Sequence, residues 1–194
     1  MVPVIVLSDG FIANGAEPWR IPTLDELPPI PARFETSPEG FLPYRRDPET
    51  LARPWALPGT PGLEHRVGGL EKQDGSGSVS YDPLNHERMV RLRAEKVARI
   101  ADSLPACTPT GDPDGELVVV GWGSTHGAIE AAVRAQRGRG RKVGHVHLRH
   151  LNPLPKDLGR VLSRYRRVLV VEMNLGQLLF VLRGALLLEA VGLH

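Results

Sequence analysis

The run Glu116-Leu-Val-Val-Val120 is followed at once by Gly121-Trp-Gly-Ser-Thr125, and this combination is the clearest indication of the fold in the sequence. An unbroken apolar run rich in valine is typical of a strand that is buried on both faces of a sheet. The glycines and hydroxyl residues that follow are typical of a tight turn into a helix, since Ser124 or Thr125 can cap the first turn. We therefore predict a strand at 116–120 and a helix that extends to about Gln136.

Two further apolar runs repeat this arrangement. Lys142–Leu148 leads into Leu151-Asn-Pro-Leu-Pro155, and Arg167–Val171 leads into Glu172-Met-Asn-Leu-Gly-Gln177. Helix-length spacers between buried strands indicate parallel crossovers, so the pattern predicts a parallel α/β sheet. In such sheets ligands gather outside the carboxyl ends of the strands, where all three polar loops should lie.

Further elements are expected outside this alternation. Val2–Leu7 is predicted as a buried-type strand, and helices are predicted from Pro155 to about Tyr165 and over Gln177–Val191, with no strand after the last helix. A helix is also predicted over about 84–103, capped by Asp82-Pro83 or Asn85. Its expected buried stripe consists of Val90, Ala94, Val97 and Ala101, flanked by Met89 and Ile100.

The chain is predicted to have three parts. Its 194 residues suit one domain or one and a half, and most of its 18 prolines fall before residue 114. We divide it into residues 1–21, a proline-rich linker at 22–113 that carries the one helix, and the α/β domain at 114–194. Because the first strand lacks a partner nearby in sequence, we expect an internal or C-terminal piece of a longer protein.

Composition narrows the class of protein. Hydrophobic content of 41%, charged content of 24% and a net charge of +2 are ordinary for a globular protein and give no argument for nucleic-acid binding. No signal peptide is predicted, because the apolar residues 1–7 lack a basic n-region and end early at Ser8-Asp9-Gly10. No membrane span is predicted, because the apolar stretch after Val168 is interrupted by charged and amide side chains. Cys107, the single cysteine, excludes an internal disulfide and cannot supply an iron–sulfur cluster by itself. The composition fits the reducing cytoplasm.

Several polar groups are candidates for binding a phosphate or a metal ion. The turn at 121–125 could bind phosphate through backbone N–H groups, but it lacks the Walker lysine and a full dinucleotide fingerprint, so we interpret it as structural. His145 and His147 share one face of their strand and His150 lies near its end, but no carboxylate or thiol lies close in sequence to complete a metal site. We predict no metal site and no catalytic residue in this chain. Packing is the expected role of these histidines.

The strand ends supply the candidate contact residues. Residues 131–156 contain no acidic residue and seven basic ones, and Arg149 stands out because it lies at a carboxyl end. Asn152 and Asn174 should lie at the same edge, although Asn174 can instead cap the last helix. Asp9 and Asn14 are candidates for a subunit or cofactor contact, since their spacing is wrong for a magnesium–diphosphate site.

These motifs together resemble a family, because they occur in one order along nearly the whole chain. The segments are Val4-Ile-Val-Leu-Ser-Asp-Gly-Phe-Ile-Ala-Asn-Gly15, Glu17-Pro-Trp-Arg20, Pro58-Gly-Thr-Pro-Gly-Leu-Glu-His-Arg66, Gly68-Gly-Leu-Glu-Lys72, Tyr81-Asp-Pro83, Arg91-Leu-Arg-Ala-Glu-Lys-Val-Ala98 and the three polar loops quoted above. The set resembles the α subunit of 2-oxoacid:ferredoxin oxidoreductases, especially the 2-oxoglutarate type.

The resemblance implies a fold, cofactors and partners. Residues 1–21 would be the last part of a pyrimidine-binding domain, with its final strand, and 114–194 a transketolase C-terminal-like domain truncated at its end. The enzymes decarboxylate a 2-oxoacid on thiamine diphosphate, form an acyl-CoA and reduce ferredoxin. The β subunit would carry the diphosphate–magnesium site and the iron–sulfur cluster, and Arg149, Asn152 and Asn174 would shape the mouth for substrate and coenzyme A.

Departures from the family pattern limit what this chain can do. The family's Tyr-Pro-Ile-Thr-Pro stretch has no counterpart here, and no position matches the glutamate that activates the cofactor. We therefore expect the isolated chain to be inactive. Two alternatives remain open from sequence: the terminal domain of another thiamine enzyme, such as a 2-oxoacid dehydrogenase β subunit, or a non-catalytic nucleotide-binding or interaction module.

Overall fold

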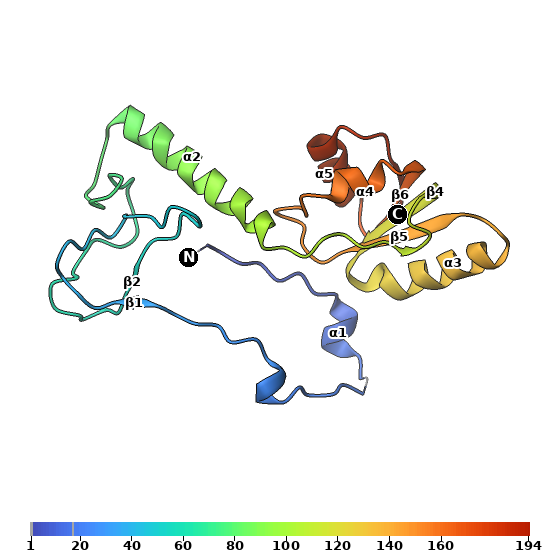
Figure 1. Ribbon diagram of the computed structural model, residues 1–194, viewed down its shortest axis with the longest axis horizontal. Coiled ribbons are helices and arrows are strands. Elements are labelled where there is room, and N and C mark those ends of the chain that lie inside the picture. Colours follow the sequence, from blue (N-terminus) through green and yellow to red (C-terminus); the bar gives the residue numbers. More distant parts are fainter. Residues whose placement is uncertain (1, 17) are drawn as a thin grey trace. The chain divides into compact units, whose positions relative to one another are not determined.

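The structure is a computed structural model that describes residues 2–16 and 18–194 (Figure 1). The chain forms two compact units. One unit comprises residues 2–4 and 18–100, and the other comprises residues 5–16 and 101–194. Met1 and Glu17 lie outside the described residues. Both belong to the predicted 1–21 segment, and Glu17 is also the first residue of the Glu17-Pro-Trp-Arg20 motif.

The second unit is built on a five-stranded sheet. Its strand order is β3-β5-β4-β6-β7, and β4 to β7 run parallel while β3 is antiparallel to β5. The strands are β3 (Thr110–Gly111), β4 (Gly115–Trp122), β5 (Val143–Leu148), β6 (Tyr165–Val171) and β7 (Val191–Leu193). The α/β class with a parallel sheet is confirmed, and β4, β5 and β6 are the three strands predicted from the apolar runs.

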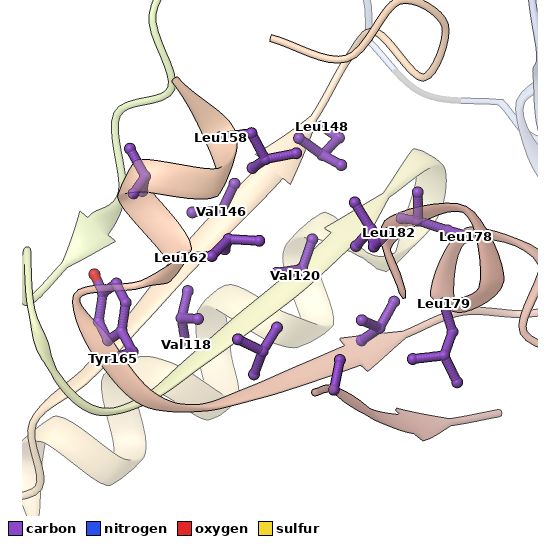
Figure 2. Close-up of a cluster of buried hydrophobic side chains, with 14 residues drawn as sticks. Val118, Val120, Val146, Leu148, Leu158, Leu162, Tyr165, Leu178, Leu179 and Leu182 are labelled. Carbon is purple, nitrogen blue, oxygen red and sulfur yellow. The ribbon is translucent and has the colours of Figure 1, made fainter. Parts of the chain in front are cut away.

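Helices cover the two faces of this sheet unequally (Figure 1). Consecutive residues of a strand point to opposite faces, so Val118 and Val120 of β4 pack on one side and Val119 on the other. The first side receives leucines from α4 (Leu158–Leu162) and α5 (Gln177–Leu186), which point down onto the strands in Figure 2. The other side receives Ile129 and Val133 of α3 (His126–Gly138).

The edge strands were not predicted, and the expectation of no strand after the last helix is wrong. Helix α5 ends at Leu186 rather than at Val191, because Leu187 takes a left-handed conformation with φ of 50°. The chain then turns back, buries Ala190 and pairs Val191 with Leu169 of β6. Strands of two or three residues carry too little periodicity to be recognised in sequence.

The predicted strand at Val2–Leu7 is also wrong. These residues have no regular structure, and Val4, Ile5 and Val6 are at least 80% exposed. A strand needs a neighbour for its backbone groups, and the described residues place none beside this segment. The short helix α1 (Gly10–Asn14) follows it.

Helix α4 is shorter than the predicted 155–165. The helix ends at Leu162, and Tyr165 already begins β6. The Tyr165 hydroxyl donates a hydrogen bond to the Asp112 carbonyl over Gly144, where an added Cβ would meet both atoms. The tyrosine is therefore held by the sheet rather than by the helix.

Gly121 allows α3 to lie close to β4. A Cβ at this position would meet Ile129 Cδ1 and lie 2.7 Å from Thr125 Oγ1. Ile129 is 4% exposed, and the Thr125 hydroxyl donates to the Trp122 carbonyl at 2.8 Å, so neither side chain can easily move. The glycine at the start of the 121–125 turn thus has a packing role, which supports the structural interpretation of this turn.

Glu172, at the end of β6, positions the start of α5. Its buried carboxylate accepts hydrogen bonds from the backbone N–H groups of Leu178 (2.9 Å) and Leu179 (3.0 Å). It also accepts from the Asn174 amide at 3.0 Å and from the Trp122 indole at 3.3 Å. Burial alone would raise the pKa of Glu172, but these donors together hold the pKa below its ordinary value of 4.5.

The first unit contains little regular structure besides one helix. It holds the 3-10 turn η1 (Leu24–Glu26), the paired two-residue strands β1 (Phe34–Glu35) and β2 (Trp55–Ala56), and α2 (Pro83–Arg99), which the 3-10 turn η2 (Ile100–Asp102) continues.

Helix α2 agrees with the predicted helix, and Asp82 caps it by accepting from Leu84 N–H at 3.0 Å. Ion pairs four residues apart join Glu87 to Arg91 and Glu95 to Arg99 along this helix. No helix in the described part of the chain is both long and apolar enough to span a membrane.

The buried face of α2 differs from the predicted stripe. Of the predicted residues, Met89 and Ala101 are buried and Val97 and Ile100 are half-buried, but Val90 and Ala94 are exposed. The polar residues Asn85 and Lys96 are buried on this helix instead. Asn85 accepts from Asp74 N–H and donates to the Lys72 carbonyl, both at 2.9 Å. An irregular connector has unpaired backbone groups, so the helix face that contacts it uses a polar side chain that can satisfy them.

Replacing Glu172 should destabilise the chain and change its acid sensitivity. Glu172→Gln exchanges an acceptor oxygen for an N–H donor facing buried N–H groups, so we expect a loss of about 2 kcal/mol in unfolding free energy at neutral pH. Because its pKa is lowered on folding, the wild-type carboxylate stabilises the fold above pH 4.5 and loses this contribution as the pH falls further. Urea unfolding followed by circular dichroism, at neutral and acidic pH, measures both effects.

Glu189→Gln is the matched control for this change, since Glu189 is an exposed glutamate in the segment between α5 and β7. Equal losses in the two variants would contradict the role of Glu172.

The packing role of Gly121 predicts an unequal response of two glycines. Gly121→Ala should lower the unfolding free energy by about 1–3 kcal/mol, because the new methyl group overpacks the α3 contact. Gly127→Ala, where a Cβ meets no atom within 4 Å, should leave stability unchanged or raise it by up to about 1 kcal/mol. Thermal and urea unfolding of both variants would test this, and a similar effect in both would refute it.

Candidate functional site

The three polar loops lie at one edge of the sheet. Trp122 at the end of β4 is in register with Leu148 at the end of β5, and Gly121 is in register with Val171 at the end of β6. Because these strands are parallel, the segments after them leave the sheet on the same side. The three polar loops therefore follow strand ends that lie side by side, and a ligand site at this edge stays a prediction.

Glu172 joins two of these loops. Its carboxylate is bonded to the indole N–H of Trp122, which ends β4, and to the Asn174 amide, which follows β6. The same carboxylate caps α5, so the indole, the loop and the helix are held by one buried anion. In the sequence, Glu172 is only the first residue of the polar loop after the third apolar run. Its role could not be predicted there, because its hydrogen-bond partners come from separate elements.

Asn174 is bonded at both ends of its amide group. Its oxygen accepts from the N–H groups of Gly176 (2.8 Å) and Gln177 (3.2 Å), while its nitrogen donates to Glu172. The N-cap residue of α5 is Gly176, and Asn174, two residues before it, binds the N–H groups of that residue and of the first helical residue. Its half-buried side chain orients the loop around α5, and any contact with a ligand stays a prediction.

Arg149 and Asn152 are more exposed than Asn174 and, unlike it, make no hydrogen bonds among the described residues. Both are exposed and follow β5, and Asn152 precedes the cis peptide bond to Pro153. Within the described residues, neither side chain makes a hydrogen bond or ion pair. Their polar groups are available at the carboxyl edge, and their role at a ligand mouth remains a prediction.

Asp9 contacts the turn after β4. Its carboxylate accepts the backbone N–H of Ser124 at 2.8 Å. A backbone N–H that could have received an anion is thus bonded to an aspartate of the same chain. Asn14 donates to the Gly10 carbonyl within α1, so its described contact is local. The predicted contact of Asp9 and Asn14 with a subunit or a cofactor stays a prediction.

Three histidines form a cluster on the α3 face of the sheet. His145 and His147 lie on β5 as predicted, and His126 at the start of α3 joins them, with ring centroids 4.7–5.8 Å apart. His150 is exposed beyond the strand. His126 was missed because it is distant in sequence, although its place directly after the 121–125 turn puts it next to β5. In residues 2–16 and 18–194, no group of three or more histidine, cysteine or acidic side chains is arranged to hold a metal ion.

The basic stretch at 131–156 is partly paired and does not form a single patch. Arg134 pairs with Glu130 and Arg137 with Asp112. Arg141 instead lines a hollow on the α3 side, together with Gln136 and Arg167. This hollow lies by the amino ends of the strands, away from the carboxyl-edge loops, so it does not belong to the candidate site.

Known proteins match this chain over its α/β domain and beyond. Residues 115–190 match the family model of the pyruvate:ferredoxin oxidoreductase core domain II. The 2-oxoglutarate oxidoreductase subunit KorA of Mycobacterium tuberculosis is 57% identical over 188 residues, which are 96% of this chain and 28% of that protein. The α subunit of 2-oxoacid:ferredoxin oxidoreductase 1 of Aeropyrum pernix is 32% identical over 91% of this chain and 28% of its own length.

A solved structure agrees with these relatives. The 2-oxoglutarate:ferredoxin oxidoreductase from Magnetococcus marinus, with 2-oxoglutarate, coenzyme A and succinyl-CoA bound, superposes with a TM-score of 0.80 at 26% identity, covering 89% of this chain and 30% of that one. The chain thus spans less than a third of the length of these matches. In sequence and in fold, it is a homologue of part of the α subunit of 2-oxoacid:ferredoxin oxidoreductases.

Proposed function

We propose that this chain acts as part of the α subunit of a 2-oxoacid:ferredoxin oxidoreductase with 2-oxoglutarate as substrate. The observation that carries the proposal is the 57% identity, over 96% of the chain, with a protein named as a 2-oxoglutarate oxidoreductase subunit. The structural neighbour solved with 2-oxoglutarate, coenzyme A and succinyl-CoA supports the same substrate class.

The reaction would convert a 2-oxoacid and coenzyme A into an acyl-CoA and carbon dioxide. The bond between the carboxylate and the carbonyl carbon breaks, the thiol of coenzyme A forms the new thioester, and two electrons pass to ferredoxin. Thiamine diphosphate, when bound in the complete enzyme, stabilises the negative charge left by decarboxylation.

The contribution of this chain would be to bind and orient rather than to break bonds. Arg149 can offer a guanidinium to the carboxylates of a 2-oxoacid or to the phosphates of coenzyme A. Asn152 can offer an amide on the same loop, and both side chains are exposed and unbonded among the described residues. Asn174 would act through the loop that it and Glu172 hold in place.

Other parts of the enzyme would hold the cofactors. The described residues bring together no acidic or histidine group suited to magnesium, and the single Cys107 cannot ligate an iron–sulfur cluster alone. As the family resemblance implies, we assign the magnesium–diphosphate site and the cluster to a β subunit, with ferredoxin as electron acceptor. The cytoplasm is the proposed location, which the cysteine-poor composition fits. Residues 1–21 would belong to a pyrimidine-binding domain and 22–113 to the linker that follows it.

The proposed mouth predicts a binding defect. In a complete complex of α and β subunits, Arg149→Ala or Asn152→Ala should raise the Michaelis constant for 2-oxoglutarate or for coenzyme A by about tenfold, since losing a hydrogen bond to a charged group costs roughly 1.5–3 kcal/mol. Arg134→Ala, which removes a cation on the outer side of α3, is the control. Unchanged constants for both substrates in both variants would contradict the proposal.

The isolated chain should be inactive. Supplied with thiamine diphosphate, magnesium, 2-oxoglutarate and coenzyme A, the purified 194-residue polypeptide should not reduce an electron-accepting dye, because the groups that hold the cofactors lie elsewhere. Substrate-dependent dye reduction above that of a no-protein blank would refute this division of roles.

A further inference from the structure

The histidine cluster joins α3 to the sheet through three imidazole rings. His126, the first residue of α3, lies 4.7 Å from His147 and 5.4 Å from His145 between ring centroids, and the two β5 rings are 5.8 Å apart. The His126 and His147 rings meet edge to face at 86°. The beginning of α3 is therefore in contact with β5 through ring packing.

The polar atoms of this cluster lack hydrogen bonds. His145 is 1% exposed, and both of its ring nitrogens, together with Nδ1 of His147, are buried without a partner among the described residues. A buried imidazole without a partner is tolerable when neutral, but a proton on it would create an unsolvated cation.

The surroundings offer little compensation for added positive charge. From α3, Glu130 faces the cluster, with Oε2 3.8 Å from Nδ1 of His126, but its carboxylate is 43% exposed and is shared with Arg134 at 3.7 Å. Directly after β5, Arg149 adds a further cation near His147. Beside His145, β3 and β4 supply Thr110 and Val119, which do not titrate. One shared carboxylate faces three imidazoles and a guanidinium.

We propose that His126, His145 and His147 form a proton-sensitive latch that holds the first half of α3 on the sheet. With neutral rings the latch is closed, and the 121–125 turn is fixed between β4 and α3. Protonation places cations side by side, so the start of α3 separates from β5 while the strands stay paired. The loop edge would loosen with it, since the turn that α3 holds lies there.

The direction of the pH dependence follows from the shifts. Burial, followed by the charges of His147 and His126, lowers the pKa of His145 from 6.5 to about 4, and burial also lowers the pKa of His147. A histidine whose pKa is lowered on folding stabilises the closed state fully above its ordinary pKa of 6.5. This stabilisation is lost as the pH falls from 6.5 toward about 4.

Amide hydrogen exchange of the full chain tests the latch. After correction for the intrinsic pH dependence of exchange, the opening constant of amides 127–133 should rise about tenfold or more between roughly pH 7.5 and pH 5. Amides 118–120 of β4 should not change in parallel, because the sheet stays intact. In His145→Phe, which keeps an aromatic ring and removes the titration, the rise in α3 should largely disappear.

Two variants complete the test. His150→Phe, which changes an exposed histidine outside the cluster, should behave as wild type, and His126→Phe should reduce the rise if His145→Phe does not fold. A wild-type α3 with no pH-dependent opening, an equal rise in the folded cluster variants, or simultaneous opening of β4 and α3 would each overturn the proposal.

Discussion

The buried carboxylate of Glu172 is the interaction on which the carboxyl edge of the sheet depends. It lies at the end of β6 and accepts hydrogen bonds from two N–H groups of α5, from Asn174 and from the Trp122 indole. Burying a carboxylate is unfavourable unless its charge is met by donors, and here four donors from three segments meet it. The same bonds that satisfy the charge therefore set the direction of α5 and the position of the loop after β6. A ligand that approaches this edge would meet loops that are already ordered.

The two faces of the sheet have different chemistry. The face under α4 and α5 is filled by valine and leucine side chains, which make a dry core (Figure 2). The face under α3 has only a small apolar cluster, and next to it β5 presents two histidines instead of aliphatic side chains. Protonation therefore acts on one helix and leaves the larger core unchanged. The helix concerned follows the Gly121–Thr125 turn, so a response at the cluster would reach the proposed ligand edge through α3.

Much of this domain could be predicted from local sequence. The valine-rich runs of β4, β5 and β6 identify buried parallel strands, and the polar residues after them identify the edge where the site lies. Predictions failed where distant contacts decide the structure. Val2–Leu7 has the composition of a strand, but the described residues place no strand beside it, whereas Val191–Leu193 is a strand because β6 offers it an edge. The face of α2 was misjudged because its partner is a connector with unpaired backbone groups, which Asn85 satisfies better than valine would.

Three features could be established from the amino-acid order alone: the parallel α/β class, the three loops of the carboxyl edge, and the likeness to 2-oxoacid:ferredoxin oxidoreductase α subunits. These depend on short-range patterns and on the order of motifs along the chain, which are present before any folding. Only the tertiary structure decided that Glu172 bonds to Trp122 and α5, that Asp9 lies at Ser124, and that His126 meets His145 and His147. Each of these contacts joins residues from separate elements, and the crossover connections and the packing of helices on the sheet bring them together. The spacing of residues along a strand or helix carries no information about contacts between separate elements.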